Sequence, residues 1–177
     1  MAHEPVAVVP YDPEWPGRFE VERELLERIL APWLEGGVHH IGSTAIPGIA
    51  AKPIIDMMAG VRDLEEARAA FGPLCEHSYL VAPHRPNEAH HFVKPSPRLS
   101  EATHGLHLTE PRSDLWRERL AFRDALRGDP ALAAEYEALK LRLAEEHRQG
   151  GGAYTAAAKR PFVAHVLAST GIQLRAG

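Results

Sequence analysis

The sequence lacks several features that mark exported, disulfide-bonded or membrane-spanning proteins. It has a single cysteine, Cys75, among 177 residues, so no internal disulfide forms and no cysteine pair is present to hold structural zinc. No run of about 18 apolar residues occurs, and the amino terminus has no basic stretch followed by an apolar segment. We therefore expect a cytoplasmic protein that does not enter the membrane.

An excess of positive charge is also absent. Lys and Arg number 20 against 24 Asp and Glu, which gives a formal charge of −4 and no general attraction for nucleic acids or anionic membranes. The G-x-S-x-G, G-x-x-x-x-G-K and G-x-G-x-x-G motifs are missing, which argues against the usual serine hydrolases, P-loop kinases and dinucleotide enzymes. Histidine, in contrast, is abundant, with 11 residues.

Hydrophobic periodicity predicts a single domain over residues 1–177, with a mixed sheet of five or six strands and flanking helices, an α/β or α+β fold. The predicted strands are residues 5–10, 38–43, 53–61, 79–82, 91–94 and 106–109. Helices are expected over residues 16–34, after the capping residue Asp63, from 113 or 114 to 128, from 132 to about 150, and from 154 to 169 with a bend or restart at Pro161.

The segment from His39 to Val61 carries the most chemical information. One strand delivers Gly42 and Ser43 into a tight turn, and the next strand is an apolar run interrupted by the single acid Asp56. A glycine allows close backbone approach to a phosphate, a hydroxyl donates to it, and a carboxylate can hold a divalent cation that bridges its oxygens. Lys52 adds a positive charge beside them.

Structural explanations compete with this one. Ser43 can simply cap a short helical turn, and Asp56 can form a buried salt bridge with Lys52 or Arg123. The histidines are in general expected to be structural, and Lys140 and Arg142 are predicted to lie on the solvated side of an amphipathic helix.

The pattern of Ile41-Gly42-Ser43 followed by Asp56 resembles the polymerase-beta-like nucleotidyltransferase superfamily. In that superfamily a second acid normally follows the first by two residues, and Met58 stands at that position here. Two-metal phosphoryl transfer depends on such paired carboxylates.

Five ordered motifs extend the resemblance over almost the whole chain, to the GrpB-like family. They are YDPEWPGRFEVE, HIGSTAIPGIAAKPIID, LAFRDALRGDP, YEALKLRLA and YTAAAKRPFV. The resemblance implies a minimal nucleotidyltransferase-like fold with a C-terminal helical segment. It also implies a hint of nucleotide or coenzyme chemistry, because some such modules are joined to dephospho-coenzyme A kinase.

The same resemblance nominates further site residues. Family members tend to carry a His-Leu-His triplet on a later strand, where this chain has Gly105-Leu106-His107 preceded by His104. In a regular strand His104 and His107 face opposite sides, so only a bulge lets them share an ion. Arg123 and Lys159 lie in family motifs and are candidates to reach a phosphate.

Three functions follow as hypotheses. The first is a metal-assisted protein that binds a nucleotide or small phosphorylated ligand and, if catalytic, acts as a nucleotidyltransferase. In this hypothesis the phosphate is bound by Gly42, Ser43, Lys52, Arg123 and Lys159. Asp56 and His107 bind Mg²⁺ or Mn²⁺ or act in catalysis. The second is a noncatalytic ligand-sensing or interaction module of the same fold. The third is a metal-dependent hydrolase in which His ligands and Asp56 hold Zn²⁺ or Ni²⁺.

Overall fold

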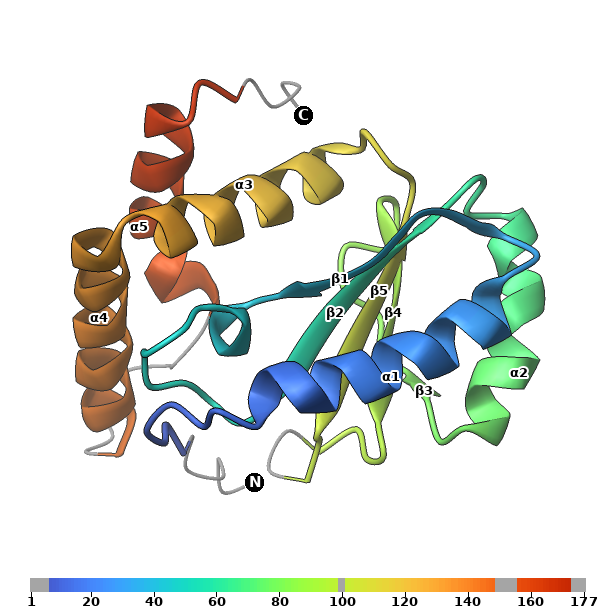
Figure 1. Cartoon of the computed structure of the whole chain (residues 1–177), viewed down its shortest axis with the longest axis horizontal. Helices are drawn as coiled ribbons and strands as arrows, with labels where there is room; N and C mark the ends of the chain where they lie inside the picture. The colour runs from blue at the N-terminus through green and yellow to red at the C-terminus, as the bar shows by residue number, and fades with distance from the viewer. Residues whose placement is uncertain (1–6, 99–100, 149–155, 173–177) are drawn as a thin grey trace.

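The computed structural model describes residues 7–98, 101–148 and 156–172, and its backbone forms one mixed sheet with helices on both faces (Figure 1). In chain order the elements are α1 (Trp15–Leu30), β1 (Leu34–Ile41), η1 (Ser43–Ala45), β2 (Ile55–Val61), η2 (Glu66–Ala70), α2 (Phe71–Glu76), β3 (Leu80–Val81), β4 (Ala89–Lys94), β5 (His104–Thr109), α3 (Asp114–Gly128), α4 (Pro130–Arg148) and α5 (Ala156–Ser169). The predicted mixed α/β architecture is thus confirmed.

The sheet has the strand order β1-β2-β5-β4-β3. Its central pair, β2 and β5, is parallel, while β1 with β2, β4 with β5 and β3 with β4 are antiparallel. Strand β2 is nearly all apolar because it lies between two neighbours and is covered on both faces.

One face of the sheet packs against α1 and α2 and contains the larger apolar core. Phe19, Leu26 and Leu30 of α1 meet Met57 of β2 and Leu106 of β5 there. On the other side of the sheet runs α3, and α4 and α5 pack on α3 and on the loop after η1 (Figure 1). Strand alternation therefore decides which side chains enter each layer.

The boundaries differ from the predicted ones mainly at the first strand. The first helix ends at Leu30 instead of Leu34, consistent with Pro32 supplying no backbone N–H to continue it, and β1 begins at Leu34. Gly36 and Gly37 have φ angles of +83° and +82°, and a register irregularity lies between Leu34 and Val38. The glycine pair thus lies within the strand as a bulge and does not separate two elements.

The elements predicted near the two ends of the chain lie only partly within the described residues. Of the strand predicted at residues 5–10, residues 5 and 6 lie outside the described part, and Val9 forms an isolated bridge with Ala51. Tyr154 also lies outside it, whereas α5 runs through Pro161 without a break. None of the helices in the described ranges is both long and apolar enough to cross a membrane.

Candidate functional site

Asp56 lies at the centre of the candidate site, on the face of β2 that the C-terminal helices cover. It is opposite Ile41 of β1 and Gly105 of β5 in the sheet register. A Cβ atom on Gly42 would lie 2.8 Å from Asp56 Oδ2, and one on Gly105 would lie 2.6 Å from Oδ1. The two glycines therefore provide the space that the carboxylate occupies, and Gly42 also has a φ of +72° that favours glycine.

Three cationic side chains from separate segments surround this carboxylate. Burial raises the pKa of Asp56 to about 6, and the positive charges of Arg119, Lys159 and Lys52 oppose that rise. Burial also lowers the pKa of both lysines, while Asp56 counteracts the decrease. The carboxylate and the cations thus act on one another inside a common, partly desolvated space.

The alternative of a structural salt bridge is not what the structure shows. Across residues 7–98, 101–148 and 156–172, no hydrogen bond or ion pair reaches the Asp56 carboxylate. Arg123 instead donates from Nε to Asp124 at 2.7 Å and from Nη1 to the His40 carbonyl at 3.2 Å. Arg123 therefore lies against the edge strand β1 and not beside Asp56, unlike Lys52 and Lys159.

The Gly-Ser loop is held from outside by the helices. Ser43 interacts with the hydroxyl of Tyr136, whose pKa is raised by burial. Further along the loop, Ala50 donates its N–H to Glu137 Oε1 and accepts a bond on its carbonyl from Lys140 Nζ, both at 2.5 Å. Helix α4 thus binds both polar groups of one residue, two positions before Lys52.

The prediction that Lys140 lies on a solvated surface is therefore wrong. Its side chain is 1% exposed, and Nζ lies 5.0 Å from the Tyr136 ring centroid. Burial lowers its pKa to about 8. A lysine between leucines on a helix predicts a solvated face. The sequence gives no signal that the distant Ala50 carbonyl accepts a hydrogen bond from this lysine.

His107 shares the Asp56 face of the sheet, two positions further along β5 than Gly105. Its ring stacks on His91 at 4.3 Å, and His84 lies 6.1 Å away. Burial, followed by the charges of its neighbours including Arg119, lowers its pKa well below the ordinary value, so it is neutral at pH 7. Its Nδ1 is buried and has no hydrogen-bond partner in the described structure.

The His/Asp metal centre of the hydrolase hypothesis is not formed by these residues. In the described part of the chain, no group of three or more His, Cys, Asp or Glu side chains is arranged to hold a metal ion. His104 faces the opposite side from His107, as strand alternation predicts, and lies 3.9 Å from Glu22. The other paired histidines bind elsewhere: His40 to Thr44, His39 to the Gly36 carbonyl and His90 to the Leu64 carbonyl.

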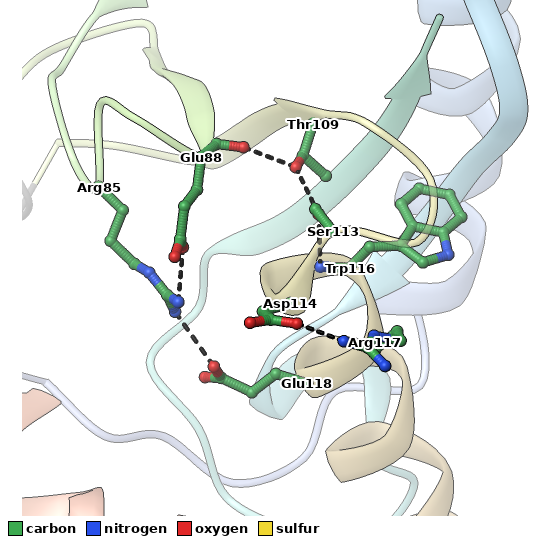
Figure 2. A network of polar contacts seen from close by, with 8 residues as sticks. All are labelled: Arg85, Glu88, Thr109, Ser113, Asp114, Trp116, Arg117 and Glu118. Carbon is green, nitrogen blue, oxygen red and sulfur yellow. Dashed lines mark hydrogen bonds and ion pairs between the residues drawn. The ribbon is translucent and has the colours of Figure 1, made fainter. Parts of the chain in front are cut away.

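A polar network fixes the start of α3, the helix that supplies Arg119 (Figure 2). Thr109 donates to the Glu88 carbonyl at 2.7 Å and contacts the hydroxyl of Ser113, which accepts the N–H of Trp116 as the helix cap. Arg85 pairs with Glu88 at 2.5 Å and with Glu118 at 3.2 Å, and Arg117 pairs with Asp114. The Ser113 cap confirms one of the two predicted helix starts.

The chain is similar to known proteins over most of its length. Residues 5–169 match the family described as GrpB protein. The Glutamate-rich protein GrpB of Alkalihalophilus pseudofirmus is 33% identical over 165 residues, which cover 92% of this chain and 94% of that protein. A Dephospho-CoA kinase of Mycolicibacterium paratuberculosis is 29% identical over 92% of this chain but only 45% of its own length.

A solved structure shows the same fold. The crystal structure of the conserved protein GrpB from Enterococcus faecalis superposes with a TM-score of 0.82 at 30% sequence identity. The match covers 93% of this chain and 96% of the other.

Proposed function

Because the chain belongs to the GrpB family, we propose that it binds a nucleotide or another small phosphorylated molecule at the site around Asp56. The observation that carries the proposal is the convergence of the positive charges of Lys52, Arg119 and Lys159 on the Asp56 carboxylate. Several cations gathered around one site are suited to phosphate oxygens. The similarity to a Dephospho-CoA kinase supports the same class of ligand.

A divalent ion fits this site only together with the ligand. Asp56 is a single carboxylate, Met58 stands where a second acid would follow, and Gly105 lies beside Asp56 on β5. Mg²⁺ is commonly held by one or two carboxylates plus the phosphates of a substrate. Asp56 would therefore hold an ion that the phosphates bring, and the ion would offset the repulsion between the carboxylate and the phosphates.

The same residues favour binding over group transfer. Two-metal phosphoryl transfer requires carboxylates that place both ions, and the neighbours of Asp56 supply cations instead. The roles of His107 as an ion ligand or as an acid or base stay predictions; its low pKa makes it a neutral imidazole, which suits an acceptor. The proposal is thus closest to the noncatalytic ligand-binding module of the same fold.

Calorimetric titration with ATP tests the proposal, performed once with Mg²⁺ and once with EDTA. The wild-type protein should bind ATP with Mg²⁺ and lose about tenfold in affinity with EDTA, a change of about 1.4 kcal/mol. Asp56→Asn should bind equally well under both conditions, because no carboxylate then repels the phosphates. Lys159→Gln should weaken binding under both conditions.

Glu24→Gln, which removes one exposed negative charge from α1, is the matched control and should behave like the wild type. Absence of ATP binding by the wild type, or the same Mg²⁺ dependence in Asp56→Asn, contradicts the proposal.

A further inference from the structure

A pocket of about 510 Å³ lies along the outer edge of the sheet, and Asp56 is not among the residues that line it. Its lining residues come from α1, from the edge strand β1, from the loop around η1 and from α3. Figure 1 shows β1 running between α1 and α3. Its volume is within the range of small-molecule sites. Neither Asp56 nor Lys52 lines it, so this edge pocket is not explained by the function proposed above.

The walls of the edge pocket combine apolar surface with positive charge. Phe19 of α1 and Val38 of β1 are buried at its base, and Pro47 is exposed at its rim. Arg23, Arg123 and Arg127 line it with Glu20 as the single acid. Three cations against one anion make the pocket positive in a chain whose formal charge is −4.

The three arginines differ in how far they are neutralised. Arg23 pairs with Glu20 at 2.7 Å and with Glu27 at 2.8 Å, and Arg123 pairs with Asp124. Arg127 donates from Nε to the Ala45 carbonyl at 2.8 Å, and no carboxylate of the described chain lies within ion-pair distance of it. The Arg127 guanidinium is thus fixed by a neutral partner, and its charge remains available.

The positive charge of the arginines affects His40, one of the residues that line the pocket. His40 stacks on Phe19 at 4.8 Å, and its pKa is lowered to about 4 by burial and then by Arg127 and Arg123. The positive field that opposes a proton on His40 favours an anion in the same space. Arg123 and Arg127 are also four residues apart on α3, so they project from the same side of the helix.

We propose that the edge pocket binds a small organic anion. Its carboxylate or phosphate group is held by Arg127 and Arg123. Its apolar body packs against Phe19, Val38 and Pro47, where an inorganic ion has nothing to contact. Guanidinium groups present several donors in a fixed plane and suit both carboxylate and phosphate oxygens.

Nuclear magnetic resonance of the full-length, ¹⁵N-labelled protein tests this proposal with four probes: phenyl phosphate, phenylacetate, benzyl alcohol and inorganic phosphate. Phenyl phosphate and phenylacetate should shift the amide signals of Val38, His40 and Ala45. Benzyl alcohol lacks the charge and inorganic phosphate lacks the apolar body, so each should bind at least fivefold more weakly than phenyl phosphate.

Variants locate the binding. Arg127→Gln should weaken the binding of phenyl phosphate at least fivefold. The matched control Arg142→Gln, on the exposed face of α4, should leave the affinity unchanged. Because Arg127→Gln also removes a contact with the loop, Pro47→Glu provides a second variant that places a negative charge at the rim. Pro47→Glu should weaken phenyl phosphate binding to a similar extent and leave Mg²⁺-dependent ATP binding unchanged.

Equal binding of benzyl alcohol and phenyl phosphate overturns the proposal, as does unaltered affinity in both Arg127→Gln and Pro47→Glu. Shifts confined to Gly42 and Gly105, beside Asp56, overturn it as well, because they place the anion in the other site.

Discussion

Replacement of Asp56 by Asn should stabilise the ligand-free protein at neutral pH. The folded-state pKa of Asp56 is about 6, against an ordinary value of 3.8. At roughly 1.4 kcal/mol per pKa unit, ionisation of this buried carboxylate costs the folded state about 3 kcal/mol at pH 7. Asn keeps the shape of the neutral acid, so the variant avoids that cost.

The sign of the pH dependence follows from the same pKa values. Between pH 3.8 and 6 the folded protein holds the Asp56 proton more tightly than the unfolded chain, so this group's contribution to stability falls as the pH rises through that interval. The advantage of Asp56→Asn should therefore be small near pH 4, grow through pH 5 and reach its full size of about 3 kcal/mol above pH 6.

Urea unfolding of both proteins in EDTA at pH 4.5, 5.5, 6.5 and 7.5 measures this difference. The control Glu24→Gln removes an exposed charge and should change the free energy of unfolding by less than about 0.5 kcal/mol. An Asp56→Asn protein that is less stable than the wild type at pH 7.5, or a difference that is the same at every pH, would refute the reasoning. The first result would mean that the Asp56 carboxylate stabilises the fold, and the second that its ionisation is not the source of the difference.

Two further substitutions test how the site is built. Gly105→Ala should destabilise the protein by about 2 kcal/mol, because the new Cβ meets Asp56 Oδ1 at 2.6 Å. In an Asp56→Ala background, thermal unfolding should show that most of this loss of stability is absent, and an equal loss in both backgrounds would exclude the contact as the cause. Lys140→Ala should destabilise the protein by about 2 to 3 kcal/mol, since the Ala50 carbonyl loses a charged hydrogen-bond donor. If urea unfolding shows a loss of stability no larger than that of Arg142→Ala, the hydrogen bond contributes little.

Local sequence patterns predicted much of the architecture because they depend on nearby residues. The apolar run of β2, the Ser113 cap and the alternation that separates His104 from His107 are each visible within a few positions. Asp56 was identifiable because an acid inside such a run needs a special environment. The position of Lys159 near Asp56 followed only from the family motif.

Contacts between distant segments could not be predicted in this way. Arg119 has no local pattern that points to Asp56, and Lys140 reaches a carbonyl 90 residues earlier in the chain. A family motif makes Arg123 a candidate for phosphate, but the motif does not indicate that its guanidinium donates to the His40 carbonyl of β1. The direction that a helix side chain takes depends on how α3 crosses the sheet, which the sequence of the helix alone does not determine.

The order of the elements has a consequence for partial unfolding. All five strands of the sheet precede α3, α4 and α5 in the chain, and α3 and α5 supply Arg119 and Lys159, whose charges act on Asp56. If these helices detach while the sheet persists, Asp56 returns to water and its charge no longer opposes the open form. Ionisation of this one carboxylate thus promotes partial unfolding of this layer. Hydrogen exchange should report it as protection in α3–α5 that decreases as the pH rises from about 4 to about 6, relative to the α1 side of the sheet.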